Sequence, residues 1–94
     1  MKGEVKLKQE VKDLLNAKGA YWFMPVQMGY GVSGTPDFLC CIDGKFVGIE
    51  TKAPGKRASK FQEFRIRQII DAGGVAFWTD SIAYTKQMLE AAGL

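Results

Sequence analysis

The Asp43-Gly44 pair constrains the fold of this chain more than any other feature, because it lies between two apolar runs at residues 38–42 and 46–49. An Asp-Gly pair between apolar runs is the strongest short-range signal for a β-hairpin with a two-residue turn. Such a turn fixes the register of the two strands. In this register, Asp37 is expected directly opposite Glu50.

The hairpin therefore brings two carboxylates together. Opposed residues in an antiparallel pair have Cβ atoms roughly 4.5–5.5 Å apart, and like charges at that distance destabilise the pair. Side chains alternate between the faces of a strand, so Lys52 shares the face of Glu50 and Thr51 points away from it. Hard divalent cations such as Mg2+ bind oxygen ligands of this type. The pattern predicts a metal site next to a lysine.

An alternative is that Asp37 and Glu50 end two solvated strands, with Lys52 as their neutralising partner. The register and the shared face favour the site. Gly48 favours it too, because a residue without a side chain is expected to leave that face open beside Glu50.

The composition indicates one globular domain, residues 1–94, with 47% apolar and 12% aromatic residues. No uncharged stretch is apolar enough to span a membrane. Charged residues alternate through positions 2–8, where the apolar part of a signal peptide would begin. We therefore expect a cytoplasmic protein without a membrane partner.

The sequence contains no histidine, which excludes Ser-His-Asp and Cys-His triads and histidine-based zinc hydrolase sites. Any catalysis must use carboxylates, lysine and a metal ion. The net charge of +3 allows a polyanionic partner without requiring one. Cys40 and Cys41 are adjacent on one strand, so they point to opposite faces, and we expect both to be buried reduced thiols.

Residues 4–18 are expected to form an amphipathic helix with an apolar face of Leu7, Val11, Leu14 and Leu15. Helical geometry places Glu4 at the margin of this face, about 20° from Val11. A functional role for Glu4 and a favourable interaction with the N-terminal end of the helix dipole explain this position equally well.

Strands and helices then alternate along the chain. We expect a strand at residues 20–28, a glycine-rich loop at 29–36, the hairpin, a helix at 60–72, a strand at 75–79 and a last helix, capped by Asp80 or Ser81, through residue 92. The order αβββαβα indicates an α/β domain with one mixed sheet flanked by helices.

The helix at 60–72 begins with the pattern of a capping box, in which Ser59 is the N-cap and Gln62 is its partner. This role alone explains Gln62, although Gln62 also shares the inward face of the helix. The predicted apolar face consists of Phe61, Ile66, Ile69 and Ile70.

Basic residues gather after the hairpin, namely Lys56, Arg57 and Lys60, with Arg65 on the following helix. Side chains of this kind neutralise phosphates in nucleic-acid complexes. They also keep a helix soluble, and the sequence alone leaves both interpretations open.

Taken together, these residues resemble the PD-(D/E)XK nuclease superfamily. The resemblance rests on Glu4, Pro36-Asp37, Glu50-Thr51-Lys52 and Gln62. Within the superfamily, the segments SGTPDF and GIETKAPG are most similar to the virus-type replication-repair nuclease (VRR-NUC) domain, in the stand-alone form of phages and bacteria. The resemblance covers nearly the whole chain and implies a restriction-endonuclease-like fold.

The resemblance also implies roles for the hairpin residues. Asp37 and Glu50 would be the central ligands of Mg2+ or Mn2+, and the backbone carbonyl of Thr51 would complete the protein's share. Lys52 would orient or help to deprotonate the attacking water, or stabilise charge on the phosphate.

Two further residues and the basic cluster have implied roles. Glu4 would assist the metal site, directly or through water. Gln62 would position the water or a phosphate. The DNA-binding residues would be Lys56, Arg57, Lys60 and Arg65.

The implied activity is metal-dependent hydrolysis of phosphodiester bonds in DNA repair, often in branched DNA such as four-way (Holliday) junctions or flaps. A homodimer is expected, because a two-fold dimer would present two sites to a two-fold junction. Candidate contacts are Tyr21, Trp22, Phe23 and Trp78. A non-catalytic nucleic-acid-binding module with the same fold, and a subunit whose specificity comes from a partner, are the alternatives.

Overall fold

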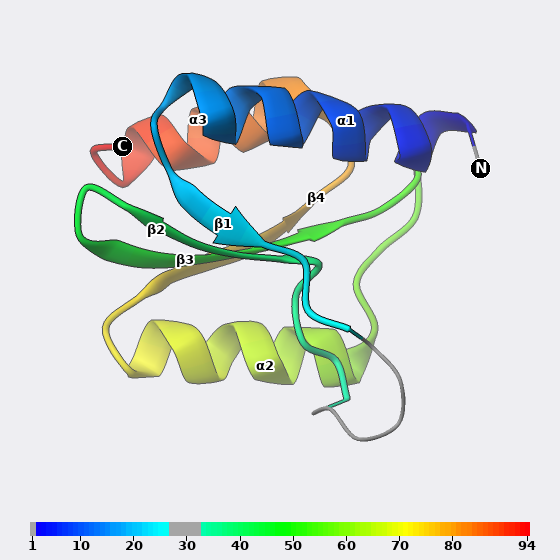
Figure 1. Ribbon diagram of the computed structural model, residues 1–94. Coiled ribbons are helices and arrows are strands. Elements are labelled where there is room, and N and C mark those ends of the chain that lie inside the picture. Colours follow the sequence, from blue (N-terminus) through cyan, green and yellow to red (C-terminus); the bar gives the residue numbers. More distant parts are fainter. Residues whose placement is uncertain (1, 27–32) are drawn as a thin grey trace.

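Helices cover both faces of a sheet in the computed structural model, which describes residues 2–26 and 33–94. In chain order the elements are α1 (Lys2–Ala17), β1 (Tyr21–Phe23), β2 (Phe38–Ile42), β3 (Lys45–Thr51), α2 (Lys60–Asp71), β4 (Val75–Thr79) and α3 (Ile82–Ala91). Helices α1 and α3 lie on one face of the sheet and α2 lies on the other (Figure 1). The predicted αβββαβα order is confirmed. No helix in these two ranges is long and apolar enough to cross a bilayer.

The strands lie in the order β1-β2-β3-β4, and the register of the hairpin is the predicted one. Ile42 pairs with Lys45, and Phe38 pairs with Ile49. The turn residue Asp43 has a φ of 49° and Gly44 has a φ of 79°, as a two-residue hairpin turn of type I′ requires. β1 and β2 are also antiparallel, whereas β4 runs parallel to β3, so the sheet is mixed as predicted.

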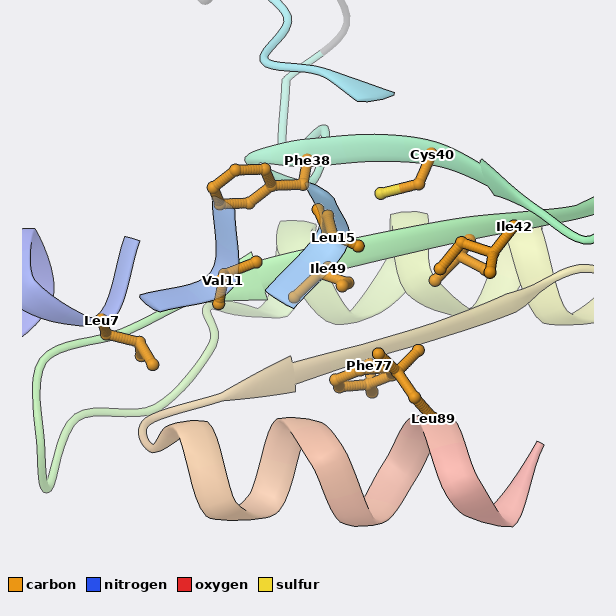
Figure 2. Close-up of a cluster of buried hydrophobic side chains, with 10 residues drawn as sticks. Leu7, Val11, Leu15, Phe38, Cys40, Ile42, Ile49, Phe77 and Leu89 are labelled. Atoms are coloured by element: carbon orange, nitrogen blue, oxygen red, sulfur yellow. The ribbon is translucent and has the colours of Figure 1, made fainter. Parts of the chain in front are cut away.

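The main core lies between the sheet and the layer of α1 and α3. Figure 2 shows side chains from both layers meeting there, namely Leu7, Val11 and Leu15 of α1, Phe38, Cys40 and Ile42 of β2, Ile49 of β3, Phe77 of β4 and Leu89 of α3. Each large apolar side chain buried in this way contributes roughly 1.5–3 kcal/mol. The core therefore fixes α1, and the polar residues on its margin, against the ends of β2 and β3.

Helix α2 begins with the predicted capping box. The Oγ of Ser59 accepts the backbone N–H of Gln62, and the Oε1 of Gln62 accepts the backbone N–H of Ser59. Of the two caps predicted for α3, Ser81 is the one observed. Both helix starts therefore follow from local hydrogen bonding.

The buried face of α2 is narrower than the sequence predicted. Ile66 is buried, but Phe61 is 64% exposed and Ile70 is 38% exposed, so the prediction that these two face the core is wrong. Figure 1 shows α2 alone on its side of the sheet among the described elements. A helix that packs against a single layer buries one stripe and leaves its flanks in solvent.

Two smaller predictions about the hairpin are also wrong. A Cβ at Gly48 would lie 2.8 Å from Cδ1 of Ile69 and 3.2 Å from Cγ of Pro36, so Gly48 permits close packing and does not open the face. Cys40 is buried, and burial raises the pKa of its thiol to about 12. Cys41 is exposed, on the face of β2 opposite to that of Cys40.

β1 is shorter than the strand predicted at residues 20–28, and residues 27–32 of that strand and of the glycine-rich loop lie outside the described residues. The loop resumes at Ser33, whose carbonyl accepts a hydrogen bond from Nε of Arg65 at 2.9 Å. Gly34 has a φ of 80°, and a Cβ there would lie 2.7 Å from the carbonyl oxygen of Phe61. Only glycine fits at the point where the loop crosses the first turn of α2. The loop then leads directly to Asp37.

Candidate metal centre

Asp37 and Glu50 meet at the open end of the hairpin, as the register predicts. Asp37 lies one residue before β2, and its backbone N–H donates to Oε1 of Glu50 at 3.1 Å. The Glu50 side chain is almost completely buried, with 5% of its surface exposed, whereas Asp37 keeps 21%. A buried carboxylate next to a half-buried one is the centre of the site.

The carboxylate of Asp37 is held by Thr51. Its Oδ2 accepts the hydroxyl of Thr51 at 2.6 Å and the backbone N–H of Thr51 at 3.1 Å. Alternation correctly places the Thr51 side chain away from Glu50. The resemblance implied a role for the Thr51 carbonyl alone of this residue's groups. The side-chain contact arises because Asp37 precedes the strand and turns its carboxylate toward Thr51.

Lys52 and Gln62 both approach Oε2 of Glu50. The Nζ of Lys52 lies 3.7 Å from this oxygen, and the Nε2 of Gln62 donates to it at 2.9 Å. Because its Oε1 accepts from Ser59 in the capping box, the Gln62 amide joins the start of α2 to the site. Gln62 therefore holds Glu50, and the role that the resemblance implies for Gln62, positioning the water or a phosphate, stays a prediction.

Glu4 reaches the site only through another side chain. The Nζ of Lys8 lies 2.6 Å from Oε2 of Glu4 and 3.4 Å from Oδ2 of Asp37, so the ammonium group bridges α1 and the hairpin. Sequence reasoning missed Lys8. The spacing could have identified Lys8, because it lies four residues after Glu4, as helical ion pairs do, and one turn before the core residue Val11.

Burial and charge shift the ionisation of two groups. Burial raises the pKa of Glu50 to about 7, and the neighbouring Asp37 adds to the rise, against the opposing effects of Lys52, the Asp37 N–H and Lys8. Burial alone would lower the pKa of Lys8, but the hydrogen bond to Glu4 and the attraction of both carboxylates raise it. Lys8 is therefore an ammonium ion. The positive groups near Glu50 do not fully compensate the cost of a negative charge on its buried carboxylate.

The predicted DNA-binding residues fall into two groups. Lys56 and Arg57 are exposed in the segment that joins β3 to α2, and Lys60 is exposed at the first residue of α2. Arg65 differs, because its guanidinium donates to the carbonyl of Ser33 and to Gln68. Arg65 therefore anchors the loop before Asp37.

No family model matches the chain, and no curated protein matches it. Two solved structures do. A structure described as "VRR_NUC domain" has a TM-score of 0.80 at 20% identity, over 94% of this chain and 95% of that one. A "VRR_NUC domain protein" has a TM-score of 0.61 at 16% identity, over 89% of this chain and 88% of that one. The chain has the VRR-NUC fold. At these identities the likeness establishes the fold, and residue roles rest on the geometry above.

Within the VRR-NUC fold, the donor chemistry of this site fits a hard divalent cation. Asp37 and Glu50 supply carboxylate oxygens, and the incompletely compensated charge of buried Glu50 is what such an ion would neutralise. In the described part of the chain, no group of three or more acidic or sulfur side chains is placed to hold a metal. The fit therefore depends on two carboxylates, and Glu4 is joined to Asp37 through Lys8.

Proposed function

We propose that this chain is a metal-dependent DNA endonuclease that hydrolyses phosphodiester bonds. The observation that carries the proposal is the buried carboxylate of Glu50 opposite Asp37, with Lys52 and Gln62 on its second oxygen. A buried carboxylate next to a half-buried one and a lysine is costly for stability and is typical of a functional site. The VRR-NUC fold supports the same assignment.

In this proposal Asp37, Glu50 and the carbonyl of Thr51 would hold Mg2+ or Mn2+. The metal supplies an activated water and a positive charge next to the phosphate. Lys52 acts on the reacting phosphate or water, because its ammonium is held near Glu50 and can stabilise negative charge that develops in the transition state. Gln62 is a positioning residue that keeps the Glu50 carboxylate in one orientation.

Branched DNA is the proposed substrate, and the exposed basic segment after Lys52 is the proposed contact with its backbone. Replacing Lys56, Arg57 or Lys60 with alanine should weaken binding at all sequences. Each replacement should lower the slope of log affinity against log salt by about 1. Arg65→Ala should instead disturb the loop before Asp37, because its guanidinium is already bonded.

A homodimer through β1 is part of the proposal. β1 is an edge strand, and its residues Tyr21 and Phe23 are 75% and 49% exposed, whereas Trp22 faces the core and donates to Asn16. Unpaired edges with apolar side chains favour pairing with a second copy. Light scattering after size exclusion should show a dimer that Tyr21→Lys with Phe23→Lys converts to a monomer. Val5→Lys, at an exposed apolar residue on α1, is the control.

The decisive experiment incubates the protein with labelled four-way junction, flap and linear duplex DNA in Mg2+, Mn2+ or EDTA. Cleavage of the branched substrates with either metal, and none in EDTA, is expected. Asp37→Asn and Lys52→Ala should abolish cleavage. Their controls are Asp43→Asn in the hairpin turn and Lys45→Ala at the far end of β3. Equal cleavage by Asp37→Asn and Asp43→Asn would show that the proposed site is wrong.

A non-catalytic nucleic-acid-binding module is the second candidate. Within residues 2–26 and 33–94, no third carboxylate is placed to hold a metal together with Asp37 and Glu50, and this favours the binding module. The same experiment separates the two functions, because such a module would bind the junction without cleaving it in any metal.

A further inference from the structure

Lys8 occupies the space between two carboxylates from different elements. Its Nζ contacts Oε2 of Glu4 within α1 and Oδ2 of Asp37 at the start of the hairpin. A Glu and a Lys four residues apart on a helix commonly pair, and that rule explains the first contact. It does not explain the second contact, nor why the Lys8 side chain is only 26% exposed.

The position of Lys8 matters because many phosphodiester hydrolases hold two metal ions about 3.5–4 Å apart. A second ion beside Asp37 would need a further carboxylate from outside the hairpin. Among the described residues, Glu4 is the one joined to Asp37 through a cation, and that cation is the Lys8 ammonium.

We propose that the Lys8 ammonium takes the place of a second divalent cation, so that the site binds a single metal ion. Glu4 then serves to hold Lys8 and is not a metal ligand. This inference rests on the proposed function, because it concerns how many ions the same site binds.

The charges of the site agree with a single ion. With Glu4, Asp37 and Glu50 ionised, three negative charges face the two positive charges of Lys8 and Lys52. One divalent ion leaves a net charge of +1, which suits a phosphodiester with one negative charge. A second ion next to Lys8 would place like charges at contact distance in a partly buried site, where their repulsion is poorly screened.

The contacts of Asp37 also leave room for one ion. In the described part of the chain, the Thr51 hydroxyl, the Thr51 N–H and Lys8 all approach Oδ2. Three donor groups approach Oδ2, more than approach either oxygen of Glu50, so Oδ1 is the Asp37 oxygen that we assign to a metal shared with Glu50. Replacing Lys8 with a neutral side chain would free both Oδ2 and Glu4 for a second ion.

The test counts bound Mn2+ on the DNA-free protein, by calorimetric titration and by the loss of the free Mn2+ signal in electron paramagnetic resonance. We expect one ion per chain in the wild type, two in Lys8→Met and one in Lys8→Arg, which keeps the charge. Lys6→Met, at an exposed lysine on the same helix, should bind one ion. Thermal unfolding checks that each variant is folded, and Lys8→Gln is the second neutral variant.

Each outcome decides between the proposals. Two ions in the wild type, or one ion in both folded neutral variants, overturn the role of Lys8 and leave the nuclease proposal intact. No bound ion in the wild type, Lys8→Met and Lys8→Gln overturns the metal-dependent function itself. If the wild type binds no ion but Lys8→Met does, only the single-ion arrangement is overturned, because Lys8 would then exclude metal altogether.

Discussion

The hydroxyl of Thr51 lies 2.6 Å from Oδ2 of Asp37 and donates a hydrogen bond to it from a side chain with no exposed surface. The backbone N–H of the same residue donates to the same oxygen. Two donors from one buried residue fix the Asp37 carboxylate beside Glu50. Thr51 thus positions Asp37 through its side chain, although the predicted chemical roles belong to its neighbours Glu50 and Lys52.

Thr51→Val should lower both stability and cleavage, because it removes a hydrogen bond to a charged group. Such bonds contribute about 1.5–3 kcal/mol, so denaturant unfolding should show a loss of this size. The matched control is Thr85→Val, since the Thr85 hydroxyl is equally buried but bonds to Thr79 and to the Ser81 carbonyl, away from the site. If both variants keep the same rate per folded molecule, Thr51 does not position Asp37.

Gln62→Glu should separate the helix cap from the chemistry. A capping box accepts Glu or Gln, so helix α2 should keep its start and its circular dichroism. The new carboxylate would lie at the 2.9 Å contact with Glu50, where like charges repel, and cleavage should fall at least about tenfold. Gln68→Glu is the control, because its partner is the cationic Arg65. Full activity in Gln62→Glu would contradict a positioning role.

Glu50→Gln should make the metal-free protein more stable at alkaline pH. Burial and Asp37 raise the pKa of Glu50 to about 7 from its ordinary 4.5, so the folded state binds this proton more tightly than the unfolded state. The contribution of protonated Glu50 to the free energy of unfolding is fully present below pH 4.5, and it is lost as the pH rises through 7. Because glutamine cannot ionise, the variant should gain up to roughly 3 kcal/mol over wild type above pH 7.

The measurement for this variant is chemical unfolding in EDTA from pH 4 to 9. The gain should shrink toward acid pH, and Glu90→Gln, at an exposed carboxylate on α3, should show no such trend. A difference between Glu50→Gln and wild type that stays constant across the range would show that Glu50 ionises normally in the folded protein.

Gly34→Ala should destabilise the protein more than Gly44→Ala. Both glycines have a φ near 80°, so alanine meets the same backbone strain at each. At Gly44 nothing lies within 4 Å of the added Cβ, whereas at Gly34 the Phe61 carbonyl lies 2.7 Å away. Thermal unfolding should rank the variants in this order, and Gly34→Ala should also lose cleavage because the loop leads to Asp37. Equal melting temperatures would show that the loop can move off α2.

Local patterns in the sequence predicted most of the fold and part of the site. The turn at Asp43-Gly44 fixed the Asp37–Glu50 pair, because a two-residue turn leaves one register. The capping box located Gln62, since its partner Ser59 lies three residues away. Both features depend on short separations along the chain.

Features that depend on how a helix docks were not predictable from spacing. Lys8 joins Asp37 only because the core holds α1 against the end of the hairpin. Phe61 and Ile70 are exposed because α2 packs on one part of the sheet, and periodicity does not reveal the width of a buried face. The prediction that Gly48 leaves its face open was wrong for the same reason, because Ile69 of α2 fills the space beside it.

The hairpin has a consequence for the order in which the protein folds. Its strands are joined by two residues, and hairpins of this kind close within about 1–10 μs, before distant segments of a chain find each other. Asp37 and Glu50 therefore meet early, whereas Lys8 arrives only when α1 docks and Gln62 only when α2 does. We therefore expect the hairpin to carry an electrostatic penalty until the helices dock, so protonation or a divalent cation should accelerate folding as well as stabilise the folded protein.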